Sequence, residues 1–346
     1  MDNETIFLTK PGYFEIKKTE IPVIGPDDVL VKIRHIGICG SDVAFFEDPT
    51  IGGKIDTQLP IVLGHECGGV IVDIGRNVTG LKKGDTVALE PGIPCGKCEW
   101  CLSGKYNLCP DVNFMAAPPF KSACMSRYVS HPAIFTHKLP KGLDTIDGAL
   151  TEPLSVGFHA AERACVTPYK NIVILGAGCI GQMTLQACRY MGANKIIVAD
   201  LFDNRLEIAK QHGAMLTVNT AKEDIKKIVM ELTEGKYADL VFETAGNSVT
   251  TRLAVPLVKR GGAIVMVGNV YGETSFPFFE INEKEANIIS IFRYCNTYPA
   301  AIEAQKQGLV NVSNIVTREF PFEHAQQAFE CAINEKQTAL KVMITL

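Results

Sequence analysis

The spacing of apolar and polar residues changes near residue 150, and we divide the chain there. In the first part, short stretches alternate between apolar and charged positions, as in Val29–Arg34, where Val31 and Ile33 are followed by charged neighbours. An alternation with a period of two is typical of β-strands with one buried face. Glycine and proline separate these stretches, so residues 1 to about 140 are predicted to form a β-rich domain with long loops.

After residue 150, apolar runs alternate with segments of helical spacing. Asn171–Leu175 is a mostly apolar run suited to a strand buried on both faces of a sheet, and a helical pattern follows it. Similar pairs continue to about residue 290, which predicts a doubly wound parallel sheet. The final helix, about Phe322–Asn334, and the final strand, Leu340–Thr345, are expected to return to the first domain.

The junction between the two parts contains a predicted helix start at Leu150–Ser155. Pro153 suits the first position of a helix, and Glu152 would then lie at the helix entry, where the helix dipole favours a charged carboxylate. Glu152 is either a functional carboxylate or a simple capping group.

Composition and charge exclude several classes of function. The chain has 346 residues, of which 47% are hydrophobic and 21% charged, as expected for a globular protein of two domains. The net charge of -4 and the lack of a basic tract argue against nucleic-acid binding. The sequence starts without a secretory signal and has no apolar run long enough to span a membrane. We expect a cytoplasmic protein whose twelve cysteines are metal ligands and buried thiols.

A histidine and a glutamate, His65 and Glu66, stand side by side between an apolar run and a strand-like pattern. Burying two titratable groups is unfavourable unless a partner such as a metal ion binds both. Cys39, at the end of an earlier strand-like run, could complete a set of three zinc ligands with a fourth position open for water or substrate. Alternatively, His65 is an ordinary core histidine and Glu66 a solvated loop carboxylate.

Four cysteines follow in a segment with few apolar residues: Cys95, Cys98, Cys101 and Cys109. Such a lobe cannot form a hydrophobic core, so a tetrahedral zinc ion would have to hold it together. An iron–sulfur cluster is the alternative, but the last spacing is longer than in bacterial ferredoxins. We expect a structural zinc without a catalytic role.

A glycine-rich turn joins the strand Asn171–Leu175 to its helix, with the spacing Gly176, Gly178 and Gly181. A strand, a glycine turn and a helix in this order place backbone N–H groups against the pyrophosphate of a dinucleotide. Asp200 ends the next strand, where a carboxylate would bind the adenosine ribose hydroxyls. Leu201 and Phe202 follow it in place of a basic pair that could hold a 2′-phosphate, which favours NAD over NADP. Arg205 is the one basic residue nearby that could bind the 2′-phosphate of NADP, so NADP is the alternative.

With these residues identified, the chain resembles the zinc-dependent medium-chain alcohol dehydrogenases, most closely the sorbitol (polyol, L-iditol) dehydrogenases. The resemblance covers essentially the whole length. It implies a GroES-like β-rich catalytic domain at residues 1–151 and 292–346, with a zinc lobe at 94–110, and a Rossmann NAD-binding domain at 152–291. The strings that carry it are Gly40–Asp42, Gly64–Glu66, the four cysteines, Glu152-Pro153, the glycine turn and Phe292–Thr297.

The resemblance also implies roles for individual residues. Cys39, His65 and Glu66 would bind the catalytic zinc, with Glu152 as a fourth ligand or as the partner of the zinc-bound water, and Asp42 would orient His65. Glu152 and Ser41 would be the catalytic residues. Substrate contacts are expected from Glu152, Arg293, Tyr294, Phe45 and Phe114. Coenzyme contacts are expected from Gly176, Gly178, Ile180, Gly181, Asp200, Arg205, Val267, Gly268, Asn269, Phe292 and Arg293.

The sequence departs from the family at three places near the expected pocket. Ala44-Phe45 replaces a common His-Tyr, Phe120–Ala123 replaces an Asp-Gly loop, and Ala117 replaces a threonine. The expected reaction is oxidation of a secondary hydroxyl of a polyol such as sorbitol or xylitol to a ketose, with NAD and two zinc ions per chain. A phosphorylated polyol, suggested by Lys121, another secondary alcohol, and a non-catalytic NAD-binding protein are the alternatives. The family also implies a homotetramer.

Overall fold

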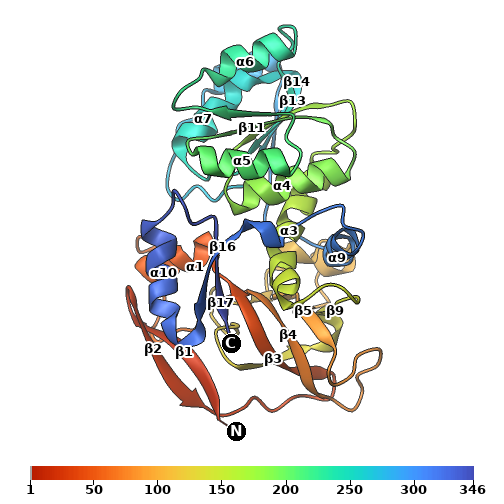
Figure 1. The fold of residues 1–346 in the computed structure, drawn as a ribbon, viewed down its shortest axis with the longest axis vertical. Coiled ribbons are helices and arrows are strands. Elements are labelled where there is room, and N and C mark those ends of the chain that lie inside the picture. Colours follow the sequence, from red (N-terminus) through yellow and green to blue (C-terminus); the bar gives the residue numbers. More distant parts are fainter. Residues whose placement is uncertain (1) are drawn as a thin grey trace. The chain divides into compact units, whose positions relative to one another are not determined.

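The structure, a computed structural model, describes residues 2–346, which form two compact units. The first unit contains the chain up to Glu152 together with residues 298–306 and 312–346, and the second contains residues 153–297 and 307–311. Figure 1 shows the elements of both units along the chain. Among the described residues, no helix has both the length and the apolar character that a membrane span needs.

The first unit is built on a sheet with the strand order β16-β17-β3-β4-β5-β9, in which β8 also pairs with β3. Two small sheets, β1-β2 and β6-β7, belong to the same unit. The strands of the unit are β1 (Asn3–Lys10), β2 (Tyr13–Thr19), β3 (Asp28–Gly37), β4 (Glu66–Ile74), β5 (Thr86–Leu89), β6 (Gly92–Ile93), β7 (Asn113–Phe114), β8 (Tyr128–Pro132), β9 (Thr136–Lys138), β16 (Val316–Pro321) and β17 (Lys341–Thr345). Its helices are α1 (Gly40–Glu47), α2 (Glu99–Leu102), η1 (Tyr106–Leu108), η2 (Ala133–Phe135), α9 (Tyr298–Lys306), η3 (Ser313–Ile315), η4 (Phe322–His324) and α10 (Ala325–Asn334).

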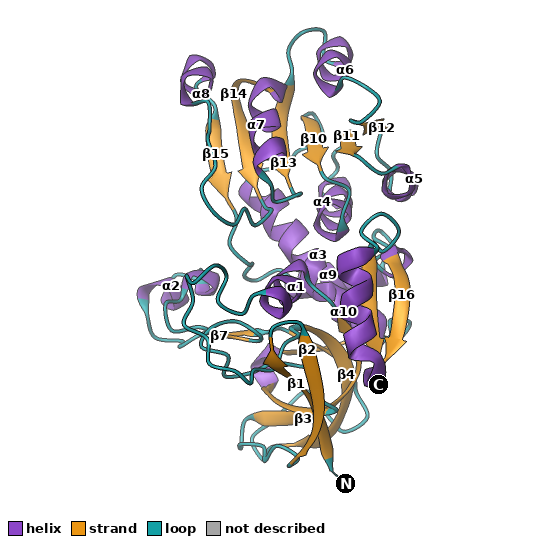
Figure 2. Ribbon diagram, turned by 90° about the vertical axis from the view of Figure 1, so that its left-hand side faces the viewer, coloured by secondary structure: helices purple, strands orange, loops and turns teal. Residues whose placement is uncertain are grey.

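Buried apolar residues alternate with more exposed ones along β3, so one face of the sheet packs against the hydrophobic core. Val29, Val31 and Ile33 are fully buried on one face and pack with β4 and β5 residues and with Phe329 of α10 in one hydrophobic core. Strand β17 pairs antiparallel with β3, so the C-terminal strand completes the sheet of the first unit. Figure 2 shows β3 and β4 together with α10 in this unit.

The second unit contains a parallel sheet with the strand order β12-β11-β10-β13-β14-β15. This is the order 3-2-1-4-5-6 of the dinucleotide-binding fold, which confirms the predicted doubly wound sheet. The strands are β10 (Asn171–Leu175), β11 (Lys195–Asp200), β12 (Leu216–Asn219), β13 (Ala238–Glu243), β14 (Val258–Met266) and β15 (Asn287–Ser290). The helices are α4 (Cys179–Tyr190), α5 (Asp203–Gln211), α6 (Ile225–Leu232), α7 (Ser248–Leu257) and α8 (Phe278–Lys284).

The predicted helix start at Leu150–Ser155 is wrong. Helix α3 runs from Thr145 to Arg163, so Pro153 lies inside it and Glu152 lies two turns beyond its start. The true start is set by Asp144, whose Oδ1 accepts the N–H groups of Ile146 at 2.8 Å and Asp147 at 3.2 Å. Asp147 Oδ2 accepts the Asp144 N–H in return, and such a reciprocal cap outweighs the preference of proline for a first turn. Glu152 is therefore not a capping carboxylate.

The point at which the chain returns to the first unit also differs from the prediction at residue 292. Residues 292–297 cluster with the second unit. The Ile291 N–H donates to Met266 O at 3.0 Å, which extends the pairing of β14 and β15 beyond the strand end. The structural units therefore change at residue 298, where α9 begins.

Candidate zinc centres and coenzyme site

Strand pairing brings together the three predicted ligands of the catalytic zinc. Gly37, at the end of β3, pairs with Glu66, at the start of β4, so Cys39 lies close to His65 and Glu66. One ligand atom from each of Cys39, His65 and Glu66 lies within 4.8 Å of the others. Sulfur, imidazole and carboxylate donors at this spacing fit one zinc ion.

Asp42 holds this group together from the first turn of α1. It is fully buried, and its two carboxylate oxygens accept the Cys39 N–H at 3.1 Å and the Gly64 N–H at 3.0 Å. Its Oδ1 also lies 3.3 Å from His65 Nδ1, at an angle short of a well-aligned hydrogen bond. Nδ1 therefore faces Asp42, which leaves Nε2 as the ring nitrogen for a metal.

The charges around His65 affect its protonation. Burial alone lowers the pKa of His65, but the carboxylate of Asp42 and the thiol of Cys39 outweigh it and raise the pKa well above its usual value. Burial likewise raises the pKa of Asp42, and the effects of His65 and of two backbone N–H groups reverse this and lower it. An arrangement that favours a positive charge at this position also favours a metal cation.

Lys341 is a charged neighbour of Glu66 that the sequence analysis missed. Its ammonium group is buried, donates to Ile38 O at 3.0 Å and forms an ion pair with Glu66 Oε2. Gly37 makes room for this carboxylate, because a Cβ there would lie 2.0 Å from Glu66 Oε2. The only sequence signal was a lysine at the start of the apolar strand Lys341–Thr345.

The other predicted residues of the first unit lie in different positions around this group. Phe114 has its ring centre 5.8 Å from that of His65, and Phe45 packs edge-on against Phe120 at 5.2 Å. Ser41 lies in the first turn of α1. Glu152 is buried in α3 and is not part of the set of atoms within 4.8 Å, which favours its role beside a bound ligand over direct coordination.

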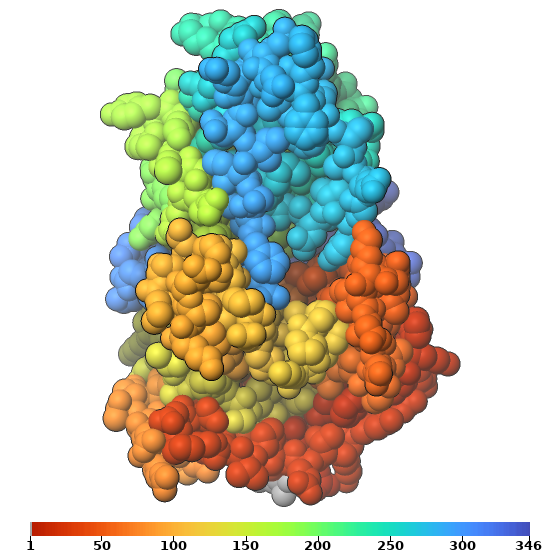
Figure 3. Space-filling view, turned by 180° about the vertical axis from the view of Figure 1, so that it is seen from behind, coloured from red at the N-terminus to blue at the C-terminus, as the bar shows by residue number. Residues whose placement is uncertain are grey.

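The four cysteines of the predicted structural site converge in the lobe that Figure 3 shows on the surface in gold. Cys98 Sγ lies 3.4 Å and Cys95 Sγ 3.9 Å from Cys101 Sγ. Thiolates around one zinc at about 2.3 Å would lie about 3.8 Å apart, so the spacing fits. Backbone N–H groups of Lys97 and Cys98 lower the pKa of Cys95 to about 7, which favours the thiolate that a metal needs.

The lobe is attached to the sheet by a buried carboxylate. Tyr106, between the third and fourth cysteines, donates its hydroxyl to Glu90 Oε1 at 2.6 Å. The other oxygen of Glu90 lies 2.8 Å from His137 Nε2 in β9. His131 Nε2 lies 3.0 Å from Glu90 O, and burial lowers the pKa of His131 to about 4. His131 is therefore a neutral structural residue.

The glycine turn lies between β10 and α4 in the second unit. Gly181 cannot be replaced by a larger residue, because a Cβ there would lie 1.9 Å from Gly176 O. Asp200, at the end of β11, accepts the Ala177 N–H at 2.7 Å and the Phe202 N–H at 3.0 Å. These bonds fix the carboxylate beside the glycine turn, where the ribose of NAD is predicted to bind.

Two further groups of predicted residues belong to the second unit. The N–H groups of Val267 and Gly268 both donate to Glu243 O at 2.9 Å, which fixes the turn that ends at Asn269. The Arg293 guanidinium lies 4.7 Å from the ring centre of Phe292, which is exposed. Tyr294 is buried and Ile180 partly exposed.

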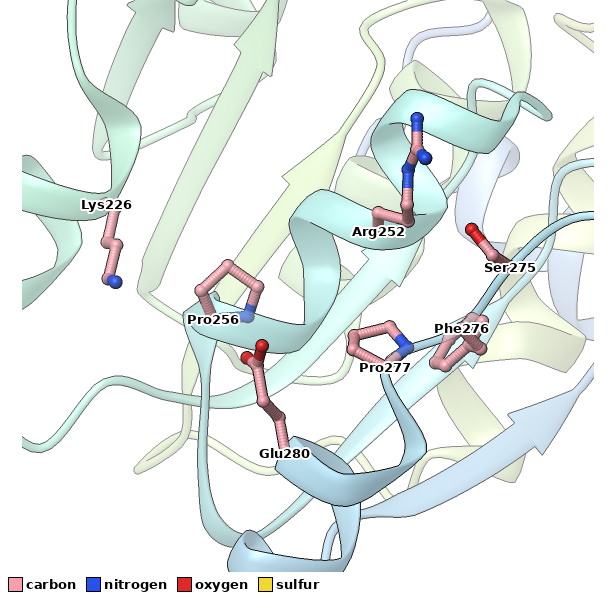
Figure 4. A pocket seen from close by; sticks show the side chains of 7 residues that line it. All are labelled: Lys226, Arg252, Pro256, Ser275, Phe276, Pro277 and Glu280. Atoms are coloured by element: carbon pink, nitrogen blue, oxygen red, sulfur yellow. The ribbon is translucent and has the colours of Figure 1, made fainter.

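A surface pocket of about 520 Å³ lies elsewhere on the second unit, between α6, α7 and the segment before α8 (Figure 4). None of the predicted metal, substrate or coenzyme residues, all of which the structure describes, lines it. We assign it no part in the site. Its lining residues are Lys226, Arg252, Pro256, Ser275, Phe276, Pro277 and Glu280.

Comparison with known proteins gives the family. Residues 25–141 match the alcohol dehydrogenase GroES-like domain and residues 179–307 match the zinc-binding dehydrogenase family. The chain is 47% identical to the uncharacterized zinc-type alcohol dehydrogenase-like protein YdjJ of Escherichia coli, over 100% of this chain and 99% of that one. It is 40% identical to sorbitol dehydrogenase of Bacillus subtilis, over 95% and 93% of the two chains.

The structure of galactitol-1-phosphate dehydrogenase from Escherichia coli superposes with a TM-score of 0.90 at 28% identity, over 99% of this chain and 100% of that one. The similarities span both units. The chain therefore belongs to the zinc-dependent medium-chain alcohol dehydrogenases, close to the sorbitol dehydrogenases, and is an NAD-dependent zinc alcohol or polyol dehydrogenase.

Proposed function

We propose that this enzyme oxidises a secondary hydroxyl of an unphosphorylated polyol such as sorbitol or xylitol to the ketose. The observation that carries the proposal is the convergence of Cys39, His65 and Glu66 in a chain that is 40% identical to a sorbitol dehydrogenase. A protein that only binds NAD would not need this set of three ligands. We assign the catalytic zinc to these residues and the structural zinc to the four-cysteine lobe.

When bound, zinc supplies a Lewis acid that lowers the pKa of a hydroxyl, and NAD accepts the hydride. The chain itself must hold the polyol and remove one proton. Phe45 and Phe114 would form apolar walls, while Arg293 and Tyr294 would donate hydrogen bonds to further hydroxyls. Because Ala44 cannot carry a proton, we assign the exit route to Ser41 and ordered water, or to Glu152.

The roles of Glu152 can be separated by Glu152→Gln, which removes the charge and keeps the shape. A carboxylate that accepts a proton or positions the substrate predicts a large loss of kcat with zinc content unchanged. An equal loss of zinc and activity would make Glu152 a ligand instead.

A phosphorylated polyol is the second candidate. Lys121 is exposed and follows Phe120, whose ring packs on the predicted substrate residue Phe45 at 5.2 Å. A cation beside the predicted pocket could bind a phosphate group. The similarity in fold to galactitol-1-phosphate dehydrogenase supports the same reading.

A substrate panel tests both candidates. The zinc-loaded enzyme is assayed with sorbitol, xylitol and galactitol 1-phosphate, each with NAD and with NADP. We expect the highest kcat/KM for an unphosphorylated polyol with NAD. A preference for the phosphate ester that is lost in Lys121→Ala would favour the second candidate, and no turnover with two zinc ions bound would contradict both.

The metal assignment needs its own control. Cys39→Ser should lose one of the two zinc ions and lower turnover by about a hundredfold or more. Cys165→Ser changes an exposed cysteine outside both zinc sites and should leave zinc content and turnover unchanged. Equal behaviour of the two variants would refute the assignment of Cys39.

We further propose a homotetramer in the cytoplasm. Strand β15 is the edge of the second sheet and carries the exposed Ile288, at 44% of its accessible surface. The neighbouring helix α8 exposes Phe278 at 63% and Phe279 at 76%. An exposed apolar edge of this kind is typical of a surface to which another chain binds. None of the twelve cysteines, all of which the structure describes, forms a disulfide, and this favours a reducing compartment. Light scattering of the purified enzyme tests the assembly.

A further inference from the structure

A fully buried glutamine, Gln182, lies in the first turns of α4, directly after the glycine turn. Its side-chain amide donates to Ala177 O at 3.1 Å and to Arg205 O at 2.9 Å. Its Oε1 lies 2.9 Å from His212 Nδ1. A single polar side chain in an apolar environment therefore joins the glycine turn to helix α5.

The identity of the partners fixes the orientation of this amide. Two carbonyl oxygens can only accept, so the NH₂ group of Gln182 must face Ala177 and Arg205. Oε1 then faces His212, whose Nδ1 must carry a hydrogen. Arg205 and His212 are seven residues apart, or about two helical turns, and lie on the same face of α5. Gln182 thus fixes both the distance and the rotation of α5 against the glycine turn.

These bonds determine the surroundings of the predicted ribose site. The Ala177 peptide is held from both sides, because its N–H donates to Asp200 Oδ2 at 2.7 Å while its carbonyl accepts from Gln182. The backbone of Arg205 is held by Gln182, and its guanidinium Nη1 lies 3.9 Å from Asp200 Oδ2. A Cβ on Gly178 would lie 3.8 Å from the same guanidinium group. Gln182 therefore helps to fix the positions of Asp200 and Arg205 relative to the glycine turn.

We propose that Gln182 is a positioning residue for the adenosine end of NAD: by joining Ala177 to α5, it sets the separation of Asp200 and Arg205 and so both coenzyme affinity and the discrimination against NADP. It does not touch the reacting atoms. A residue of this kind changes the binding of the coenzyme and leaves the chemical step alone.

The variant Gln182→Met tests this with nearly unchanged side-chain volume. We expect the Kd of NADH, measured by its fluorescence on binding, to rise about tenfold, because the variant loses all three hydrogen bonds by which Gln182 joins the glycine turn to α5. ADP-ribose, which lacks nicotinamide, should weaken by the same factor. The ratio of affinities for NADH and NADPH should fall, while kcat at saturating NAD changes less than about twofold.

The matched control is Gln186→Met, one turn further along α4. Gln186 is buried as well, but its Oε1 accepts the Asn311 N–H at 2.6 Å, away from the glycine turn and α5. Both variants should lower the melting temperature, and only Gln182→Met should weaken NADH and ADP-ribose. Equal Kd values for the two variants and the wild type, or equal weakening in both, would overturn the proposal.

A milder variant keeps the test decisive if Gln182→Met does not fold. His212→Leu removes only the contact to Oε1, at the partly exposed end of α5. It leaves Oε1 without its donor and removes one of the two links between Gln182 and α5, so it should raise the Kd of NADH about threefold with kcat unchanged. An unchanged Kd in a folded His212→Leu would show that the link from Gln182 to the end of α5 does not matter for the coenzyme.

Discussion

The carboxylate of Asp42 gives a sharp test of how the predicted catalytic zinc site is held. Asp42→Asn keeps the size and shape of the side chain but leaves one acceptor oxygen in place of two. In the structure the two oxygens serve the N–H groups of Cys39 and Gly64, at 3.1 and 3.0 Å, and His65 Nδ1 at 3.3 Å. The NH₂ group of asparagine would face at least one of these donors.

The expected loss of stability and of zinc affinity follows from the number of donors that lose their acceptor. A buried donor left unsatisfied costs about 1–3 kcal/mol, so we expect the free energy of unfolding to fall by that amount in zinc-free protein. Loss of an outer partner of a metal-bound histidine typically weakens the metal by about 10–100-fold. Asp42→Asn should therefore release the catalytic zinc to a chelator at a concentration about 10–100-fold lower than the wild type requires.

The assay has an internal reference and a matched control. A colorimetric chelator follows both zinc ions, and the zinc of the four-cysteine lobe should be released as in the wild type. Asp48→Asn, at the other end of α1, also removes a carboxylate that accepts backbone N–H groups, those of Thr50 at 3.0 Å and Gly52 at 2.5 Å. Asp48 lies outside the zinc ligand set. Wild-type release of both zinc ions from Asp42→Asn would refute the role of Asp42.

Two further predictions concern buried charges. Lys341→Met leaves Glu66 buried without its cation, so unfolding of the zinc-free protein in urea should be easier by about 3–5 kcal/mol, with a smaller loss in the zinc-loaded protein because the metal replaces the missing charge. Equal losses in both forms would contradict this. The pKa of His131 is about 4 when folded, below its unfolded value of about 6.5, so the unfolded chain binds more protons between these values. Stability present above pH 6.5 should be lost as the pH falls towards 4, by about 3 kcal/mol in total. His131→Gln should lack this part of the slope in urea unfolding, and the wild-type slope in that variant would disprove the assignment.

The sequence predicted those features whose signal lies within one short segment. The cysteine spacing, the pair His65-Glu66 and the glycine turn can each be recognised within a few neighbouring residues. In the structure the two sets of metal-ligand atoms converge and the glycine turn is closely packed. The position of Asp200 at the end of β11 was predictable from the apolar run before it, while its contact with the ribose stays a prediction. The parallel sheet followed from the apolar strands, which need helices on both faces.

Features that depend on distant pairings were not predictable. Lys341 contacts Glu66 only because β17 pairs with β3 and β3 pairs with β4. Gln182 has no local sequence signal, because its hydrogen bond to Arg205 O forms only when α5 packs against α4. The predicted start of helix α3 was wrong because Pro153 only permits a first turn, whereas the hydrogen bonds of Asp144 begin the helix at Thr145.

The charges around the catalytic zinc site lead to one more prediction. The thiolate of Cys39 and the carboxylates of Glu66 and Asp42 carry three negative charges, and Lys341 with Zn²⁺ would carry three positive ones, so the zinc-loaded site is neutral when His65 is neutral. Without zinc the same buried groups would carry a net charge of about -2, which is unfavourable in a medium of low polarity. His65 is one group that can respond, because Asp42 and Cys39 overcome the effect of burial on the imidazole and raise its pKa.

Removal of this zinc at pH 7 should therefore be accompanied by uptake of about one proton or more per chain, with His65 among the groups that bind them. A pH indicator in weakly buffered solution measures the uptake, after subtraction of the protons that the chelator itself exchanges when it binds free zinc. The zinc of the four-cysteine lobe is distinguished by its separate rate of release. In Asp42→Asn the site has one negative charge less and His65 has lost its main cause of a raised pKa, so the uptake at pH 7 should fall. A wild-type enzyme that loses the catalytic zinc without binding a proton would show that another cation already balances the site.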